Sequence, residues 1–273
     1  MKIWLDGTLQ DLEAARVSVF DHGLTVGDGI FETVKSVDGK PFALTRHLDR
    51  LARSARGLGL PEPDLDEVRR ACDAVIEANP MPLGRLRITY TGGLSPLGSD
   101  RGEAGATLVV ALGEAARRPD STATVTVPWT RNERGALTGL KTTSYAENVV
   151  ALARAREQGA SEALFANTVG QLCEGTGSNV FVVIDGEIHT PPVASGCLAG
   201  ITRALAVEWT GAKETDLPLD VLERADEIFL TSTLRDVQGV HRVDGRELPG
   251  VPGPVTAKVM RVFDERAADD LDP

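Results

Sequence analysis

Residues 139–148 read Gly-Leu-Lys-Thr-Thr-Ser-Tyr-Ala-Glu-Asn, and this run lies near the centre of the 273-residue chain. A glycine and a leucine precede Lys141, and small hydroxylated residues follow it before the chain enters a predicted helix from about 145 to 157. Most lysines are solvated charges, so the local spacing alone gives Lys141 no special role. The segments on either side of the run are therefore needed to interpret it.

The residues before this run predict a mixture of strands and helices. Asp38-Gly39 is a strong hairpin signal, because both residues tolerate the positive φ angles of a type I′ turn. Thr45 is the expected N-cap of a helix whose apolar residues recur at helical spacing, and a second helix is predicted at 64–78. Strands are predicted at 2–5, 31–37, 40–44, 85–91 and 107–112.

The composition changes at a charged, alanine-rich segment, residues 114–121. Strands and helices continue beyond it without regular alternation, so the predicted fold class is α+β. The chain ends in an acidic tail, which is expected to fray from Asp264 onward. We predict a smaller N-terminal α/β domain at 1–115, a linker at 116–121, and a larger C-terminal mixed β domain with helices at 122–273.

The composition excludes several classes of protein. Hydrophobic residues make up 42% of the chain and charged residues 25%, so a sizeable core can be buried. The net charge of −11 opposes binding to nucleic acid. No apolar run approaches the roughly 18 residues that span a bilayer, and the first residues do not form a signal peptide. We therefore expect no membrane association and a cytoplasmic location.

The sequence lacks the simplest catalytic patterns. Its four histidines never fall at metal-ligand spacings, and its three cysteines are widely separated. Neither a metal site nor a disulfide framework is expected. The chain also lacks the Gly-x-Ser-x-Gly and Gly-x-x-x-x-Gly-Lys-Ser/Thr motifs. Serine-hydrolase and P-loop chemistry therefore have no support in the sequence.

Small and hydroxylated residues at the ends of predicted elements indicate an anion site. The run Gly-Ile-Thr at 200–202 opens a helix, where backbone N–H groups and the positive end of the helix dipole can hold a phosphate. Ser232 and Thr233 follow a strand and offer further donors. Arg46, at another helix start, adds a permanent positive charge. Each residue also fits a cap, a turn or a solvated face, but together they suggest a phosphate-bearing ligand.

Further motifs flank these residues in a fixed order. Residues 20–33 read Phe-Asp-His-Gly-Leu-Thr-Val-Gly-Asp-Gly-Ile-Phe-Glu-Thr, residues 46–51 read Arg-His-Leu-Asp-Arg-Leu, and residues 174–181 read Glu-Gly-Thr-Gly-Ser-Asn-Val-Phe. With the run at 139–148, they resemble the motifs of the class IV aminotransferase family, the fold-type IV pyridoxal-phosphate enzymes. The family includes branched-chain and D-amino-acid aminotransferases and aminodeoxychorismate lyase. The resemblance covers nearly the whole chain and implies the two-domain fold of that family.

The resemblance implies a role for each matching residue. Lys141 would carry pyridoxal 5′-phosphate (PLP) covalently and move a proton during the reaction, because an unprotonated lysine is both nucleophile and base. Glu174 would keep the pyridine nitrogen protonated, so that the ring can accept electrons. Tyr145 is a candidate partner for the phenolic oxygen of the cofactor. The other residues expected to bind PLP are Arg46, Ser178, Asn179, Gly200, Ile201, Thr202, Ser232 and Thr233.

The resemblance leaves two reactions open. Thr33 stands where lyases carry a hydroxyl residue that assists proton transfer, and the loop at 92–99 lacks the Arg and His that bind carboxylate in D-amino-acid aminotransferases. The run at 141–146 is also similar to lyases. We therefore favour 4-amino-4-deoxychorismate lyase, which releases pyruvate by β-elimination to give 4-aminobenzoate for folate synthesis. The alternative is an aminotransferase that acts on branched-chain or D-amino acids, or on an amine, with a 2-oxo acid acceptor.

Two further features bear on this choice. Lyases usually carry an Arg-Gly pair where this chain has Gly92-Gly93, and the role of the nearest arginine, Arg101, is open. A cofactor-free binding protein is a third hypothesis, but it would be expected to have lost Lys141 or Glu174. The expected substrate is a small amino or 2-oxo acid. The resemblance also implies a homodimer, in which neighbouring N-terminal loops complete each active site.

Overall fold

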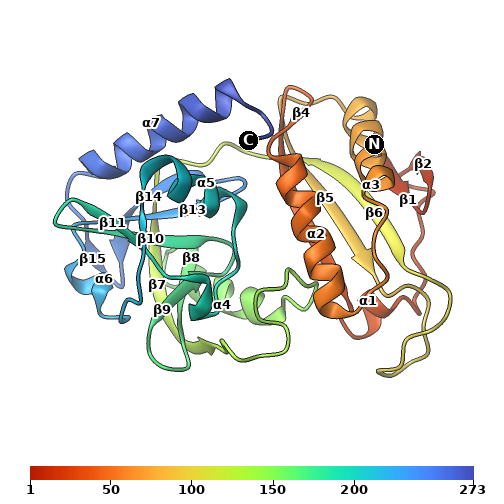
Figure 1. Cartoon of the computed structure of the whole chain (residues 1–273), viewed down its shortest axis with the longest axis horizontal. Helices are drawn as coiled ribbons and strands as arrows, with labels where there is room; N and C mark the ends of the chain where they lie inside the picture. The colour runs from red at the N-terminus through yellow and green to blue at the C-terminus, as the bar shows by residue number, and fades with distance from the viewer. The chain divides into compact units, whose positions relative to one another are not determined.

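The computed structural model describes all 273 residues, Met1–Pro273 (Figure 1). The chain folds into two compact units: unit 1 comprises Met1–Ala116, Leu140–Tyr145 and Leu271–Pro273, and unit 2 comprises Arg117–Gly139 and Ala146–Asp270. The sequence analysis assigns the two short segments of unit 1 to the C-terminal domain. They belong instead to unit 1, where the backbone N–H groups of Phe31 and Ala43 donate to them.

Unit 1 contains a six-stranded antiparallel sheet in the order β2-β1-β6-β5-β3-β4 (Figure 1). Its helices α2 and α3 pack against this sheet through an apolar core. The elements are β1 (Lys2–Leu5), β2 (Thr8–Asp11), α1 (His22–Thr25), β3 (Gly29–Val37), β4 (Lys40–Pro41), α2 (Leu44–Leu58), α3 (Leu65–Ala78), β5 (Leu83–Thr91) and β6 (Thr107–Glu114).

Local signals in the sequence explain several of these elements. The φ angles are 48° at Asp38 and 78° at Gly39, so the turn between β3 and β4 has the predicted positive φ at both positions. The helix predicted at 64–78 is confirmed, and Asp64 accepts hydrogen bonds from two backbone N–H groups at its start. The strand predicted at 40–44 stops at Pro41, because helix α2 begins at Leu44.

The last residues of the chain cap the start of helix α2. The residue before the helix, Ala43, has a left-handed backbone with φ 53° and no side chain that can cap. The backbone N–H of Ala43 donates to the carbonyl of Leu271 at 2.7 Å. The backbone N–H of Thr45 donates to Asp272 Oδ1 at 2.8 Å, and its hydroxyl donates to Asp272 Oδ2 at 2.5 Å. The prediction of Thr45 as N-cap is therefore wrong, because the capping group comes from Asp272.

The acidic tail also differs from its prediction. Helix α7 (Pro254–Asp269) continues past Asp264, where the sequence analysis expects fraying. Phe263 and Val259 are buried on this helix, and Glu227 accepts hydrogen bonds from two backbone N–H groups at its start. Buried apolar residues and a carboxylate at the N-terminus both stabilise a helix, so the acidic residues that follow remain helical.

Unit 2 contains a mixed nine-stranded sheet. Eight strands follow the order β12-β11-β10-β13-β14-β7-β8-β9, and β15 pairs with β14. Strand β7 is parallel to both of its neighbours. The elements are β7 (Ser121–Arg131), α4 (Ala146–Glu157), β8 (Glu162–Asn167), β9 (Leu172–Gly175), β10 (Asn179–Ile184), β11 (Glu187–Thr190), the 3₁₀ helix η1 (Val193–Ser195), α5 (Ile201–Thr210), β12 (Lys213–Glu214), α6 (Val221–Arg224), β13 (Glu227–Ser232), β14 (Asp236–Val243), β15 (Arg246–Glu247) and α7.

The central strands of unit 2 are buried on both faces. Every residue of β8 is buried, as are the first five residues of β10. Phe181 and Phe229 stack between β10 and β13 with their ring centroids 4.7 Å apart. Together the two units give the predicted mixture of strands and helices. No helix in the structure has the length and apolar character needed to cross a membrane.

Candidate active site

Lys141 lies on a short segment that pairs with the start of β3. The backbone N–H of Phe31 donates to the carbonyl of Lys141 at 2.9 Å, and the N–H of Thr143 donates to the carbonyl of Gly29 at 2.8 Å. The backbone N–H of Lys141 donates to the hydroxyl of Ser54 on α2 at 3.2 Å. These bonds to the sheet and to a helix fix the backbone that carries the predicted catalytic amine.

Two aromatic rings surround the amine of Lys141. Its Nζ lies 4.2 Å from the ring centroid of Phe31 and 5.7 Å from that of Tyr145. The two rings meet edge to face, with centroids 5.1 Å apart and an interplanar angle of 83°. Such contacts stabilise a cation through the negative faces of the rings and limit where its side chain can go. Lys141 and Tyr145, both predicted site residues, are thus together.

A second cation, Arg87 on β5, also contacts the ring of Phe31. Its guanidinium carbon lies 3.3 Å from that ring centroid. Burial lowers the pKa of Arg87 to about 10, against the opposing effects of Tyr145 and Glu32. The one hydrogen bond from its guanidinium goes from Nε to the hydroxyl of Thr89 at 3.4 Å. The N–H groups on the two terminal nitrogens of Arg87 are therefore available to a planar anion such as a carboxylate.

Thr33, the other predicted catalytic residue, lies on the same face of the sheet as Arg87. The two residues are direct partners in the register of β3 and β5, and Phe31 pairs with Thr89 two positions away. Side chains two residues apart on a strand share a face. Thr33 is half-buried there, so its hydroxyl belongs to the same surface as the guanidinium of Arg87.

The opposite face of β3 carries a buried charged network. Glu32 has no exposed surface, and Arg50 donates to it from Nε and Nη2, each at 2.7 Å. His47 completes the network, with Nδ1 2.7 Å from Glu32 Oε2. His47 and Arg50 are three residues apart on α2, so both face the sheet. The sequence analysis names none of these three residues as a site residue.

Charge governs the protonation of this network. Burial alone raises the pKa of Glu32, but the charge of Arg50 and the hydrogen bonds from Arg50 and His47 outweigh it, and the pKa lies well below its ordinary value. Burial, with the positive charges of Arg50 and Lys141, lowers the pKa of His47 against the opposing effect of Glu32. Glu32 is therefore an anion held by a fixed guanidinium.

The predicted phosphate ligand Arg46 lies one turn before Arg50 on α2. Its Nε donates to the backbone carbonyl of Pro273 at 2.6 Å, beside the cap formed by Asp272. Residues four apart lie on the same side of a helix. Arg50, however, is buried and paired with Glu32, so Arg46 is the candidate cation for a phosphate on α2.

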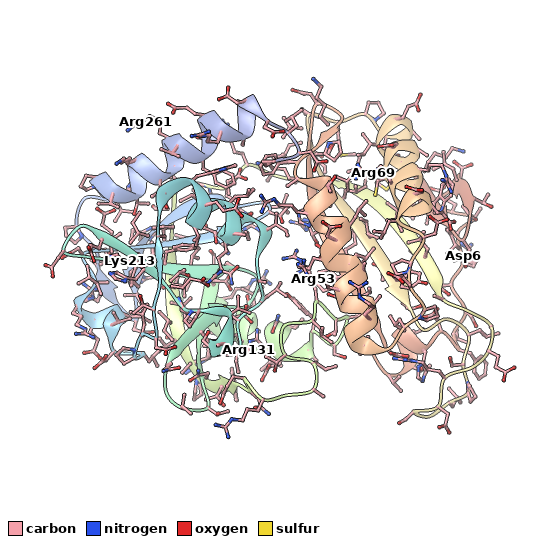
Figure 2. The ribbon with its side chains drawn as sticks, in the orientation of Figure 1. Asp6, Arg53, Arg69, Arg131, Lys213 and Arg261 are labelled. Atoms are coloured by element: carbon pink, nitrogen blue, oxygen red, sulfur yellow. The ribbon has the colours of Figure 1, made fainter.

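Glu174 occupies a fixed position on β9 in unit 2. Its Oε2 accepts a hydrogen bond from the backbone N–H of Leu198 at 2.9 Å. Its Oε1 forms an ion pair with Arg131 Nε at 3.2 Å. Arg131, labelled in Figure 2, also lies over the ring of Phe165 with its guanidinium carbon 4.0 Å from the centroid. A carboxylate held in this way can accept a hydrogen bond from a protonated ring nitrogen.

The start of helix α5 is open, as an anion site requires. Gly200 precedes the helix, and no side chain caps its first turn. A Cβ at Gly200 would lie 2.0 Å from Asn179 Oδ1, so only glycine allows this approach. Asn179 in turn donates from Nδ2 to the carbonyl of Leu198 at 2.9 Å. Ile201 and Thr202 are buried in the first turn, where backbone N–H groups are unpaired.

Strand β13 brings further donors next to Asn179. Thr231 pairs with Asn179 across β10 and β13, and its buried hydroxyl has no hydrogen-bond partner. Ser232 ends the strand and Thr233 begins the following turn, both half-buried. The predicted residues Asn179, Thr233 and their neighbours on α5 are thus gathered in one part of unit 2.

Two residues named in the sequence analysis have side-chain partners within the protein. The hydroxyl of Ser178, a predicted cofactor ligand, donates to Glu162 Oε2 at 2.8 Å, so its proton is used in a hydrogen bond within the protein. Arg101, whose role the sequence leaves open, donates from Nε and Nη2 to the carboxylate of Asp28, each at 2.7 Å. Arg101 also donates to two backbone carbonyls, which accounts for its donors without a substrate.

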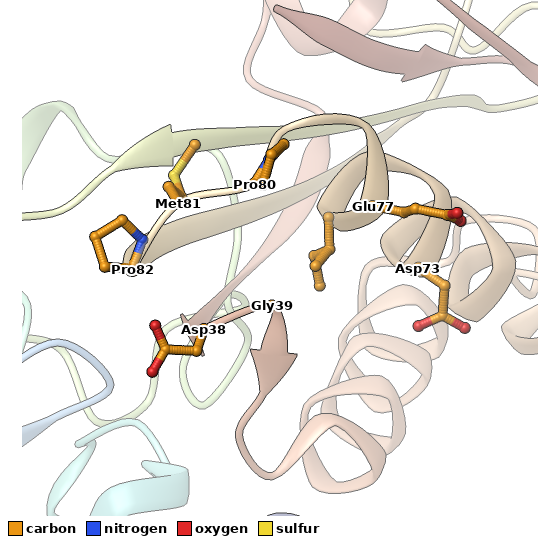
Figure 3. Close-up of a pocket in the computed structure, with 8 residues that line it drawn as sticks. Asp38, Gly39, Asp73, Glu77, Pro80, Met81 and Pro82 are labelled. Carbon is orange, nitrogen blue, oxygen red and sulfur yellow. The ribbon is translucent and has the colours of Figure 1, made fainter.

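Unit 1 also has a pocket of about 690 Å³ beside the β3–β4 turn (Figure 3). Its first lining residue, Asp38, is seven residues from Phe31, about 23 Å along an extended strand. Acidic and apolar side chains line it, without a cation: Asp38, Gly39, Asp73, Ile76, Glu77, Pro80, Met81 and Pro82. Carboxylates repel phosphate, so this pocket does not fit the predicted ligand.

Comparisons with known proteins identify the family. Residues 29–243 match the family model described as "Amino-transferase class IV". The chain therefore belongs to the class IV aminotransferases, and it is a PLP-dependent enzyme, either a transaminase or a lyase. The predicted resemblance is confirmed.

Individual relatives cover almost the whole chain. A branched-chain-amino-acid aminotransferase of Pseudomonas aeruginosa is 32% identical over 96% of this chain and 91% of its own. A bifunctional aminodeoxychorismate lyase / D-amino acid transaminase of Mycobacterium tuberculosis is 31% identical over 92% and 94%. A structure described as a hypothetical aminotransferase from Mycobacterium tuberculosis, in its PLP-bound form, superposes with a TM-score of 0.89, 28% identity, and coverage of 99% and 100%. The predicted fold-type IV architecture is confirmed.

The residues in this structure fit PLP. The open start of α5 offers N–H donors to a phosphate, and the buried hydroxyl of Thr231 lacks the partner that a ligand oxygen could supply. Gly200 permits close approach to the backbone. Lys141 offers an amine, and Glu174 offers a carboxylate that is held in place. Each unit thus carries groups that suit a phosphorylated aromatic aldehyde.

Proposed function

We propose that the protein is an aminotransferase that moves an amino group between a small amino acid, branched-chain or of D configuration, and a 2-oxo acid. The sequence analysis prefers the lyase, but aminotransferase activity appears in the names of both relatives described above. Lyase activity appears in one of them, alongside a transaminase. The balance of support therefore moves to the alternative.

The observation that carries the proposal is the placement of Arg87 beside Phe31 and Lys141. An amino acid and a 2-oxo acid each present a carboxylate next to the reacting carbon, and both must be held while the amine works. Arg87 has terminal donors that the protein does not use, close to the ring that the amine of Lys141 also contacts. We assign Arg87 as the ligand of a substrate carboxylate.

When bound, PLP supplies an aldehyde for covalent attachment and a ring that accepts electrons. Lys141 would provide the amine that attaches the cofactor, and it would then accept and return the proton of the substrate's α-carbon. Glu174 would hold the proton on the ring nitrogen, and Tyr145 would donate to the phenolic oxygen. The first turn of α5, with Ser232 and Thr233, would hold the phosphate. Arg46 would balance its charge.

The lyase is the second candidate, and Thr33 favours it. Its hydroxyl lies on the same face as Arg87, the proposed carboxylate ligand. A hydroxyl there could pass a proton to a leaving group, which an aminotransferase does not require. Both reactions need the same amine, so Lys141 does not distinguish them.

A substrate panel tests the proposal. The purified protein, loaded with PLP, is given branched-chain L-amino acids or D-alanine with 2-oxoglutarate, and separately aminodeoxychorismate. We expect 2-oxo acid formation from an amino acid, and Arg87→Met should raise the KM for that substrate at least about tenfold, the loss of one charged contact. Arg85→Met, two residues away and exposed, is the control and should leave KM unchanged. Release of pyruvate from aminodeoxychorismate, without any transamination, would establish the lyase instead.

We also propose a homodimer that covers an apolar surface of unit 1. Two segments form this surface, joined by the bridge between Asp21 and Leu94 and by a hydrogen bond from the backbone N–H of Ser95 to the carbonyl of Phe20. Its exposed side chains are Val19 (72%), Phe20 (46%), Leu24 (67%), Leu94 (51%) and Leu97 (72%). Contiguous apolar surface of this kind usually marks a protein interface.

Sedimentation equilibrium tests the dimer. The wild type should have twice the 29.0 kDa mass of one chain. A charge in the interface would be buried without a partner, so Leu24→Glu should shift the population to the monomer. Val149→Glu, at a valine 65% exposed on α4, is the matched control and should remain dimeric. A monomeric wild type would contradict the proposal.

A further inference from the structure

Glu162 is a buried carboxylate without an assigned role in the proposed reaction. It begins β8, and only 2% of its surface is exposed. Its Oε1 accepts from the backbone N–H of Ala163 at 3.1 Å, from the N–H of Thr176 at 2.9 Å and from the hydroxyl of Thr176. Its Oε2 accepts from the hydroxyl of Ser178 at 2.8 Å and from Arg235 Nη2 at 3.4 Å. A buried carboxylate with so many donors is fully satisfied and rigidly placed.

Ala163 follows Glu162 on β8, whereas Thr176 and Ser178 lie in the loop that follows β9. This loop connects Glu174, the proposed partner of the ring nitrogen, with Asn179, which contacts the residue before α5. It folds tightly over the carboxylate: a Cβ at Gly175 would lie 2.5 Å from Ser178 Oγ and 3.0 Å from Glu162 Cδ. The path of the chain between two proposed cofactor ligands therefore depends on Glu162.

The remaining donor comes from a different loop. Arg235 lies in the turn between β13 and β14, two residues after Thr233. Its backbone N–H donates to the carbonyl of Ser232 at 3.1 Å. Its side chain donates to Gln238 Oε1 and to the carbonyl of Ser161 at 3.1 Å. Arg235 thus ties the turn that carries the proposed phosphate ligands to the residue beside Glu162.

We propose that Glu162 is a positioning residue that holds both loops in the geometry that binds PLP. The inference rests on the proposed function, because the loops matter only if Glu174, Ser232 and Thr233 contact the cofactor. A carboxylate is needed because it alone offers acceptors to all these donors, one of which is a cation. An amide in its place presents an NH₂ group to donors, leaving some of them unsatisfied.

The test compares Glu162→Gln with a matched variant, Glu227→Gln. Glu227 also accepts two backbone N–H groups in unit 2, at the start of α7, but it touches neither loop. The apoprotein of each is titrated with PLP, and affinity, thermal stability and visible circular dichroism of the bound cofactor are measured. We expect Glu162→Gln to raise the Kd for PLP at least about tenfold and to weaken the dichroism. Glu227→Gln should lower the melting temperature without changing either cofactor readout.

The outcomes distinguish failure of this inference from failure of the proposed function. Equal PLP affinity and dichroism in Glu162→Gln and the wild type would overturn the inference while leaving the proposed function intact. A wild type that does not bind PLP would overturn the proposed function itself. If Glu162→Gln does not fold, Arg235→Gln decides instead, because it removes the contact of the second loop with Glu162 and leaves those of Thr176 and Ser178 in place. Its PLP affinity should then fall in the same direction, and unchanged affinity would count against the inference.

Discussion

Replacing Lys141 by alanine is expected to abolish covalent attachment of PLP and to reduce turnover at least about 10³-fold, because nucleophile and proton carrier are lost together. Borohydride reduction of the wild type should fix the cofactor on one peptide, and that peptide should contain Lys141. The structure supports the assignment, because hydrogen bonds to β3 and α2 hold this backbone and two aromatic rings surround the amine. Mass spectrometry of the reduced protein is the direct measurement.

The matched control is Lys213→Ala. Lys213 is an exposed lysine that donates to Glu187 at 2.7 Å, in unit 2. Its variant should keep the yellow colour, the covalent label and full turnover. A Lys141→Ala protein that still acquires the label after reduction would show that another amine carries the cofactor.

Glu32→Gln is expected to destabilise the protein by about 3–5 kcal/mol, the usual cost of removing one partner from a buried ion pair. The substitution keeps the shape of the side chain but leaves the guanidinium of Arg50 buried without an anion. Denaturation by urea, followed by circular dichroism, measures the loss in unfolding free energy. Glu62→Gln removes an exposed partner of Arg56 from the same unit and should cost less than about 1 kcal/mol.

The same network predicts a dependence on pH. The pKa of Glu32 is lowered in the folded protein by the charge of Arg50, against the opposing effect of burial. Its contribution to stability is therefore fully present above the unfolded value of 4.5 and is lost as pH falls toward the lower folded pKa. The difference in unfolding free energy between wild type and Glu32→Gln should shrink below that pH. A constant difference down to strongly acidic pH would contradict the assignment.

Local signals explain which parts of the fold the sequence could predict. The Asp38-Gly39 turn, the Asp64 cap and the helix after Gly200 depend on residues adjacent in sequence, and all three are present. The cap of α2 could not be predicted in this way, because Asp272 lies 227 residues from Thr45. A capping group from a remote segment leaves no pattern near the helix that it stabilises.

The buried network shows what pattern analysis missed. Arg50 lies on a charged helical face with Arg46 and Arg53, which is typical of a solvated surface. One signal was available: Glu32 alternates in phase with Val34 in the strand predicted at 31–37 and with Ile30 just before it, so Glu32 falls on an apolar face. A carboxylate at such a position needs a cation. The identity of that cation depends on the packing of α2 on the sheet.

Family motifs, in contrast, identified the cofactor but could not choose the reaction. The proposed roles of Lys141 and Glu174 would serve a transaminase and a lyase alike. Arg87, the residue that we assign to a substrate carboxylate, lies in a strand whose sequence pattern is ordinary. Its unused N–H donors could be recognised only from the structure, in which β3 pairs with β5 and Phe31 lies next to Arg87. Substrate choice is set by such contacts between strands and not by the motifs.

The division of unit 1 into three separate pieces of chain has a consequence for biosynthesis. Residues 1–116 leave the ribosome first, but β3 then lacks the strand-like segment around Lys141, and α2 lacks the carbonyl and carboxylate that close its first turn. Folding during synthesis can therefore produce only an incomplete form of unit 1, without its two later segments. Helix α2 therefore gains its cap only after residues 271–273 have been translated, long after the strands that it packs against.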